Sequence, residues 1–476
     1  GKVGTLARML ATTLAWALPD GSKIHSTKLT SSAELSPAAT LASAKAIDNY
    51  TITVRRELHR IPELLYDLQR TSAYVREKLD ELGIAYQYPV AKEGIVATIG
   101  SGKEPCVGLR ADMDALPIHE EVECPFRSRT DGKMHACGHD AHTAMLLGAA
   151  RLLQERFAAG QLHGTVKLLF QPAEEGGAGG LAMRLAGVLE DAPRIGRLFA
   201  LHVWPGLPSG VVASRAGTIM AAAGFYHAEF VGHGGHAAMP HTTVDPFMCV
   251  AAALQGLQTV ISRNLAPVEA GVVSTTFVHG GSAYNIIPGR VELGGTIRSL
   301  SKEGYRFLHE KVEAVLRGAA ALGGCSVNAT LSSIEEDCLT AAVTPPGAPG
   351  PCTFPPTANA EAGHTTVRRA AEALVGAESF VEVEPTMGGE DFAYLLAHRP
   401  GAMAFLGIGN RSLGTDVNLH NGRFQMDEGQ LHLGAALHVE LATRALAELT
   451  AGDAAGCAEG EAGPTCAEGT YLEAED

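Results

Sequence analysis

Short runs of apolar residues, each followed by polar residues, recur through the middle of the chain. They lie at 107–110, 166–170, 198–203 and 402–408. Runs of this kind are typical of strands that are buried on both faces, as in parallel sheets. Segments with a helical spacing of apolar residues separate them, for example 141–157. The pattern predicts an α/β fold with βα units around a largely parallel sheet, and ligands are expected beyond the carboxyl ends of its strands.

The stretch 216–334 has a different pattern of apolar and polar residues. Its elements are expected in the order strand, helix, strand, strand, helix, strand, which is the order of a ferredoxin-like βαββαβ unit. Because sheet-forming sequence resumes after this stretch, the unit is predicted to be a domain inserted into a larger one. The six expected elements lie at 225–231, 246–262, 272–278, 291–298, 303–321 and 327–332.

The length of 476 residues also favours two domains. The larger domain is expected to comprise 45–215 and 335–450. Residues 1–44 are basic and rich in Ser, Thr and Ala, which fits an organellar transit segment of the chloroplast type, a secretory signal or a disordered tail in a cytoplasmic protein. Residues 451–476 are rich in Ala, Gly and Glu and predict a solvated tail. Prolines in 344–356 predict a loop.

Composition narrows the class of protein. Hydrophobic residues make up 46% of the chain and charged residues 19%, which is typical of a globular protein. The net charge of −15 repels phosphate backbones and anionic lipid headgroups, so neither nucleic acid nor a membrane surface is an expected partner. The nine cysteines are irregularly spaced and odd in number, so reduced thiols are expected rather than a disulfide framework.

Candidate metal ligands gather where the predicted strands end. Three histidines, one cysteine and one aspartate lie within 135–142, at the start of a predicted helix. Imidazole nitrogen and thiolate sulfur are ligands that suit zinc and similar divalent ions. Cys137 and His139 flank a glycine, so both side chains can turn toward one ion. His135 and His142 are expected to support the site or the fold.

Glu174 and Glu175 follow the predicted strand at 166–170. Two adjacent carboxylates at a buried strand end repel each other unless a cation lies between them, so one is expected to bind a metal while the other acts as a general base. His202 and His420 complete a set of five nitrogen, oxygen and sulfur ligands. Five ligands are too many for one tetrahedral ion and suit two ions that share a ligand.

Six motifs together resemble the amidohydrolase branch of the dimetal aminoacylase and carboxypeptidase family. Members of this branch include indole-3-acetyl-amino acid hydrolases, hippurate hydrolases and N-acetyl-diaminopimelate deacetylases. The string at 131–142 is most similar to the hormone-conjugate hydrolases of plants and algae. The six motifs lie at 108–117, 135–142, 170–176, 234–241, 285–288 and 387–392.

The resemblance implies a role for each matching residue. Glu174 would be the general base, and Asp114 would orient a metal ligand from behind. The inserted domain would be a lid and dimerisation domain that brings His236 and Asn285 near the substrate. The implied metal ligands are Cys137, His139, Glu175, His202 and His420.

These residues predict a metal-dependent amidase that cleaves N-acyl amino acids, with indole-3-acetyl (auxin) conjugates as candidate substrates. Two divalent ions, Mn²⁺ or Zn²⁺, would lower the pKa of water from about 15.7 toward roughly 7. Asn285 and Arg298 are candidate donors for the substrate carboxylate, although Arg298 could also end a strand in solvent. A homodimer through the inserted domain is expected.

Two alternatives remain open. One is a deacylase of the N-acetyl-diaminopimelate or hippurate type, which uses the same chemistry on another substrate. The other is a protein that binds conjugates without hydrolysing them. The base expected at Glu174 argues against the second alternative, because a binding protein has no use for a general base.

Overall fold

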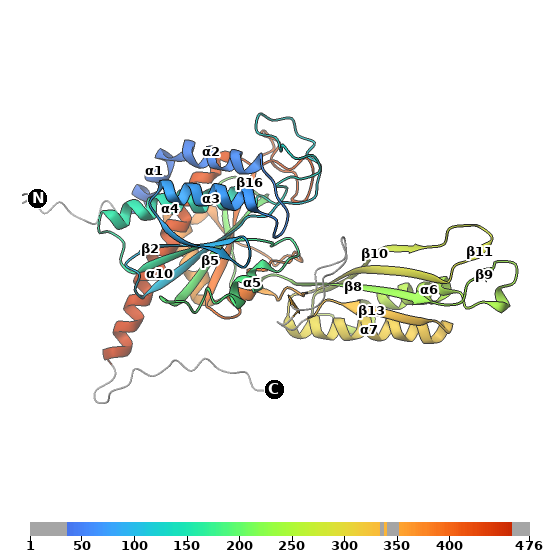
Figure 1. Ribbon diagram of the computed structural model, residues 1–476. Coiled ribbons are helices and arrows are strands. Elements are labelled where there is room, and N and C mark those ends of the chain that lie inside the picture. The colour runs from blue at the N-terminus through green and yellow to red at the C-terminus, as the bar shows by residue number, and fades with distance from the viewer. Residues whose placement is uncertain (1–35, 334–337, 340–351, 459–476) are drawn as a thin grey trace, which may run out of the picture.

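The computed structural model describes residues 36–333, 338–339 and 352–458, and they form two domains (Figure 1). The predictions for residues 1–35, for residues 344–351 of the proline-rich loop and for the last 18 residues, 459–476, lie outside the described residues. The larger domain, here called the main domain, contains an eight-stranded sheet. The smaller one, here called the inserted domain, extends away from it (Figure 1).

Four parallel strands form the centre of the main sheet, and they confirm the four buried runs of the sequence. They are β3 (Cys106–Asp112), β4 (Thr165–Gln171), β5 (Ile195–Pro208) and β16 (Gly401–Gly409). Their order is β4-β3-β5-β16, and each neighbouring pair is parallel. Every residue of β3 and β4 is buried, as expected for strands covered on both faces.

The sheet continues on both sides of this centre with shorter or antiparallel strands. The two strands β1 and β2 extend it antiparallel beyond β4, and β6 and β15 extend it beyond β16. A short pair, β7 and β14, lies where the chain crosses between the domains. The bounds are β1 Ala85–Val90, β2 Gly94–Gly100, β6 Val212–Ser214, β7 Gly217–Met220, β14 Thr357–Asn359 and β15 Phe380–Glu382.

Helices cover both faces of the main sheet. One face packs against six helices in the largest hydrophobic core, and the other packs against α5 and α9. None of the described helices is long and apolar enough to cross a membrane. The helices are α1 Pro37–Ala46, α2 Asp48–His59, α3 Gln69–Glu81, α4 His139–Ala158, α5 Gly179–Leu185, α8 Glu361–Val375, α9 Ala393–Leu396 and α10 Leu431–Ala458.

The inserted domain is a four-stranded antiparallel sheet with two helices and a hydrophobic core of its own. Its strands lie in the order β10-β12-β8-β13. A two-stranded pair, β9 with β11, lies at the end far from the main domain (Figure 1). In chain order the elements are β8 Ala222–Val231, β9 Gly235–His236, α6 Pro246–Thr259, β10 Gly271–Gly280, β11 Ile286–Ile287, β12 Arg290–Ser299, α7 Lys302–Gly323 and β13 Ser326–Leu331.

Both ends of the folded region extend further than the sequence suggests. Helix α1 begins at Pro37, inside the segment expected to be a leader or tail, because Thr40 and Ala44 are buried and the Thr40 hydroxyl donates to Glu440 at 2.7 Å. Helix α10 runs to Ala458, beyond the expected end at 450. Its alanine-rich sequence has high helix propensity, which explains why no break occurs there.

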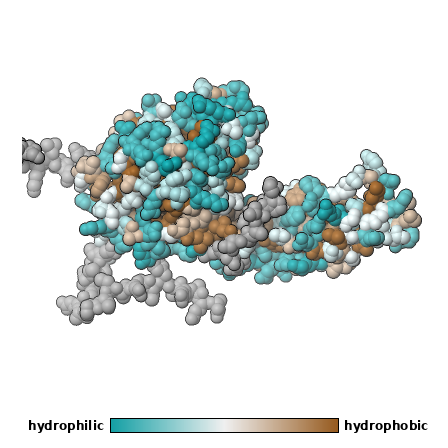
Figure 2. Space-filling view, in the orientation of Figure 1, coloured by the Kyte–Doolittle hydropathy of each residue, from teal (hydrophilic) through white to brown (hydrophobic). Residues whose placement is uncertain are grey.

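Figure 2 shows a mostly hydrophilic surface on the main domain, with apolar patches near the domain junction.

The expectation of reduced thiols is wrong for four of the cysteines. Disulfides join Cys249 to Cys325 in the inserted domain, and Cys338 to Cys352 beside the crossing between the domains. The first pair is 76 residues apart in sequence, so only the packing of α6 against the end of α7 brings the two sulfurs together. Irregular spacing along the chain therefore carried no information about these bonds.

Replacing Cys249 and Cys325 together by alanine is expected to destabilise the inserted domain by about 2–4 kcal/mol, because a long loop in its unfolded state is no longer closed. Thermal unfolding followed by calorimetry should show a lower midpoint for the transition of this domain. An unchanged midpoint would contradict a stabilising role for this disulfide.

Candidate metal centre

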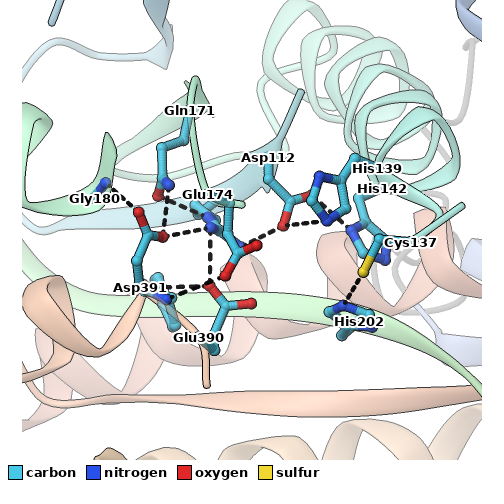
Figure 3. Close-up of polar contacts among 12 residues, drawn as sticks. Asp112, Cys137, His139, His142, Gln171, Glu174, Gly180, His202, Glu390 and Asp391 are labelled. Carbon is cyan, nitrogen blue, oxygen red and sulfur yellow. Dashed lines mark hydrogen bonds and ion pairs between the residues drawn. The ribbon is translucent and has the colours of Figure 1, made fainter. Parts of the chain in front are cut away.

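The candidate ligands lie at one edge of the main sheet, beyond or near the ends of three parallel strands. Asp112 ends β3 and Asp114 follows it, and Glu174 and Glu175 follow β4. His202 lies within β5. Because neighbouring parallel strands end at the same edge, residues that are far apart in sequence converge there (Figure 3).

Gly138 allows Cys137 and His139 to face the same space. Its φ of 89° is in the left-handed region, and α4 begins at the next residue. A Cβ atom at this position would lie 2.4 Å from Cγ2 of Val203, so no larger residue fits. The thiol of Cys137 lies 3.5 Å from Nε2 of His202 (Figure 3).

The loop with the two glutamates is held by Asp114. Its Oδ1 accepts a hydrogen bond from the Glu174 amide at 3.0 Å, and its Oδ2 accepts one from the Glu175 amide at 3.2 Å. The preceding residue, Ala173, has a φ of 57°, a conformation that a non-glycine residue keeps only when its surroundings impose it. Asp114 also lies 3.5 Å from Nδ1 of His139, where it can orient that ring.

The five predicted ligands form two groups that share one residue. Cys137, His139 and His202 have ligand atoms within 4.8 Å of one another, and so do Cys137, Glu175 and His420. Within the second group, Nε2 of His420 is 3.3 Å from Oε1 of Glu175. Two triads with Cys137 in common are the arrangement expected of two ions that share a ligand.

The donor atoms have the character of a metal site. Both ring nitrogens of His139 and Oε1 of Glu175 are buried, and none of them makes a hydrogen bond within the part of the chain that is described. Burial lowers the pKa of His139, but Asp112 and neighbouring carboxylates outweigh it and raise that pKa to about 10. Burial and the nearby carboxylates raise the pKa of Glu174 well above its ordinary value. Divalent cations would offset this concentration of negative charge.

A buried network behind the glutamates was not predicted from the sequence. Arg110 contacts Asp112 at 2.8 Å, Glu390 at 2.9 Å and Asp391 at 3.0 Å. Asp391 also accepts from the side chain of Gln171 at 2.7 Å, and its own amide donates to Glu174 at 3.4 Å (Figure 3). The motif at 387–392 therefore supports the glutamate loop. An arginine inside a buried strand was the signal that could have indicated this network.

A cavity of about 610 Å³ opens beside the two glutamates. Arg298 of the inserted domain lines it, so this candidate residue does not end its strand in solvent. Its Nε donates to the Thr296 hydroxyl at 2.9 Å, and burial lowers its pKa. The large apolar side chains that line the cavity are Trp204, Met220, Phe225, Phe354, Met387 and Leu419.

Two other candidates lie elsewhere. His236 is exposed in β9, and Asn285 is exposed just before β11, at the far end of the inserted domain (Figure 1). They lie beside each other, since the Ala237 amide donates to the Asn285 carbonyl at 3.0 Å. A single chain in this arrangement does not bring them to the metal ligands.

This fold and this site define a hydrolase of the dimetal type. Residues 108–444 match the model of Peptidase family M20/M25/M40, and the chain belongs to this family. It is 41% identical over 412 residues to the IAA-amino acid hydrolase ILR1-like 4 of Arabidopsis thaliana, covering 87% of this chain and 89% of that protein. It is also 34% identical over 432 residues to an N-acetyl-L-cysteine deacetylase of Bacillus subtilis, covering 90% and 96%.

Solved structures agree with this assignment. A dinuclear metal-binding peptidase of the M20 family from Bacillus subtilis superposes with a TM-score of 0.68 at 32% identity, over 85% of this chain and 99% of that chain. That protein binds two metal ions, and the two triads of the present chain offer ligands for two divalent ions in the same way. The predicted family and the predicted α/β fold are confirmed.

Exchanging Glu174 for Gln is expected to lower turnover by a factor of about 10² to 10⁴ with the metal content unchanged, because basicity is lost while size is kept. The matched control is Glu175→Gln, which should lower bound metal because an amide is a poorer ligand. Turnover and elemental analysis of both variants test the pair. Equal metal content in the two variants would contradict this division of roles.

Cys137 is expected to be a metal ligand and not a nucleophile. Burial raises the pKa of its thiol well above the usual value, so without metal it is a poor nucleophile. A thiol reagent at alkaline pH should modify Cys137 faster in metal-free enzyme than in metal-loaded enzyme, while Cys124, which is partly exposed, reacts equally in both. Mass spectrometry of the labelled peptides measures both rates. Isolation of an acyl-cysteine during turnover would contradict this assignment.

Proposed function

We propose that this chain hydrolyses the amide bond of N-acyl amino acids, with conjugates of aromatic acids such as indole-3-acetic acid as its preferred substrates. The observation that carries the proposal is the combination found in one cavity. Glu174, four of the five candidate metal ligands, the guanidinium of Arg298 and several large apolar side chains all line it.

Each part of the cavity has a task in this reaction. Divalent cations bound by the triads would supply Lewis acidity to the amide carbonyl and to water. Glu174 takes a proton from the attacking water and returns it to the leaving amine. Asp114 keeps the two glutamates in register through their backbone amides.

Arg298 is suited to the free carboxylate of the amino acid. Among the described residues it forms no ion pair with a carboxylate, although it is largely buried. A guanidinium in such a position gains a bidentate hydrogen-bonded partner when a carboxylate enters. Substrates that lack this carboxylate should therefore bind weakly.

The apolar side of the cavity favours a large acyl group. Trp204, Phe225 and Phe354 offer aromatic faces, and a cavity of about 610 Å³ is larger than an acetyl group requires. Conjugates of indole-3-acetic acid are thus better candidates than N-acetyl amino acids. The relatives named above act on substrates of either kind, so an N-acetyl deacylase remains the second candidate.

The identity of the metal depends on the shared ligand. Cys137 is a soft ligand that favours Zn²⁺, while the carboxylate of Glu175 and the imidazoles also suit Mn²⁺. The triad with His420 contains the carboxylate of Glu175, whereas the other triad has only nitrogen and sulfur donors, so we favour Mn²⁺ at the triad with His420.

A homodimer would complete the active site. Strands β8 and β12 pair from Ala223 with Arg298 to Val231 with Arg290, a span of roughly 27 Å at the rise of a strand. Arg298 lies at the cavity end of this ladder and His236 lies beyond its far end. A rigid inserted domain therefore cannot bring both residues to one metal centre, so His236 and Asn285 would serve the site of a partner subunit.

The inserted domain has a surface for such a partner. Strand β10 is at the edge of its sheet, where the outer backbone groups are available for pairing with a second copy. Beside it, Phe247 packs against Gly281, and Phe247 and Met248 of α6 are 39% and 64% exposed. An edge strand flanked by exposed apolar side chains favours an isologous dimer.

The two disulfides support an oxidising compartment. Disulfides persist in the secretory pathway and are rare where glutathione keeps thiols reduced. Of the addresses that residues 1–44 leave open, this favours the secretory pathway over the cytoplasm.

A substrate panel tests the proposed activity. Metal-free enzyme reconstituted with Mn²⁺ or Zn²⁺ would be given indole-3-acetyl-alanine, N-acetyl-alanine, hippurate and N-acetyl-diaminopimelate. We expect kcat/KM to be highest for the indole-3-acetyl conjugate. A higher value for N-acetyl-alanine would favour the deacylase, and hydrolysis of none of the four would contradict the proposal.

A mixing experiment tests the dimer. Glu174→Gln and His236→Ala should each be inactive alone, yet mixing them should restore about a quarter of the wild-type activity, because half of randomly paired dimers contain one intact site. Activity after subunit exchange is the measurement, and each variant exchanged with itself is the control. No recovery would mean that His236 acts within its own chain or not at all.

A further inference from the structure

Phe354 lies between two cavities at the crossing between the domains. It lines the cavity of about 610 Å³ that contains Glu174 and Arg298. It also lines a second cavity of about 420 Å³, on the side of Tyr305 and Tyr394. Because there is a cavity on each side of the Phe354 ring, the position of the ring depends on how firmly the backbone of Phe354 is held.

The backbone at Phe354 is anchored in two ways. Its amide and carbonyl pair with those of Ala223 at 2.8 and 2.9 Å, which joins it to the start of the inserted domain. Two residues earlier, Cys352 is bonded to Cys338, and both cysteines are buried, with exposures of 3% and 2%. The disulfide packs in a small apolar cluster with Leu181 of the main domain.

The wall that contains Phe354 also borders Arg298. A Cβ atom at Gly389 would lie 2.4 Å from Cβ of Ala223, 3.1 Å from Nη1 of Arg298 and 3.6 Å from the Phe354 ring. All three groups therefore crowd around the bare backbone of Gly389. A shift of the Phe354 segment would change the packing around Gly389, beside which the guanidinium lies.

We propose that the Cys338–Cys352 disulfide is a positioning element for substrate binding: it fixes the Phe354 wall of the cavity and, through that wall, the guanidinium of Arg298. This inference rests on the proposed function in one respect, namely that the ligand of Arg298 is the carboxylate of an N-acyl amino acid.

Loss of the disulfide has a specific consequence. Without the disulfide, the Phe354 side chain can move into the cavity of about 420 Å³. The part of the cavity wall that it forms, which would contact the acyl group and borders Arg298, is then no longer fixed. The metal ligands and Glu174 come from other segments, none of which the disulfide links covalently. We therefore expect its loss to lower substrate affinity, while the contacts that the metal ligands and Glu174 make within their own segments keep the metal centre intact.

The test compares two pairs of cysteines. Replacing Cys338 and Cys352 by alanine should raise KM for the best substrate of the panel about tenfold, with kcat within about twofold and metal content unchanged. The matched control replaces Cys249 and Cys325, which form the other disulfide, and should leave KM unchanged. An unchanged KM in the first variant, or a loss of metal together with kcat, would overturn the proposal.

A second variant tests whether the disulfide acts on substrate binding through Phe354. Phe354→Ala should raise KM to a similar extent, and it should have little further effect once Cys338 and Cys352 are replaced, because both changes remove the same wall. Independent, additive effects would overturn the link between the disulfide and Phe354.

A third measurement does not depend on turnover. Amide hydrogen exchange at Thr353 and Phe354 should be faster without the Cys338–Cys352 disulfide and unchanged in the control pair. Unchanged exchange would overturn the positioning role. If the wild-type enzyme hydrolysed no substrate of the panel while this exchange still rose, the proposed function would fail and the structural role of the disulfide would stand.

Discussion

The structure depends on a concentration of buried negative charge at one edge of the main sheet. Asp112, Asp114, Glu174, Glu390 and Asp391 are all at most 6% exposed. Removing carboxylates from water costs several kcal/mol each unless cations compensate. Arg110 contacts three of them, whereas no lysine or arginine among the described residues forms an ion pair with Asp114 or Glu174. Divalent ions held by the two triads would supply positive charge here, so metal binding would also stabilise this edge of the sheet.

The backbone meets this constraint with conformations that few residues adopt. Gly138, Ala173 and His420 all have φ values in the left-handed region, and each lies at or next to a metal ligand or the general base. Such positions persist only where neighbouring contacts impose them, here the Asp114 bonds to the glutamate loop and the bond from the His420 amide to Ala136. These contacts within the chain thus help to fix the geometry of the donor atoms.

The sequence was enough to predict those parts of the structure that depend on residues close together in the chain. The four buried runs became β3, β4, β5 and β16, and the glycine between Cys137 and His139 predicted their convergence. Arg110 could not be assigned a role in the same way, because its partner Asp391 is 281 residues away. The disulfides and the distant position of His236 also depend on how separate elements pack. Contacts between residues that are far apart in the chain produce no repeating pattern of apolar and polar residues from which they could be predicted.

In the proposed dimer, the two ends of the inserted domain would contribute to two different active sites. The pairing of β8 with β12 keeps Arg298 at one end, and β9 follows at the other with His236. In the proposed dimer, the same domain binds a substrate carboxylate in its own subunit and reaches the reaction centre of its partner. A change in the angle of this domain alters both contacts together. The hydrophobic core and the disulfide within the domain favour such rigid movement, because they resist bending between its two ends.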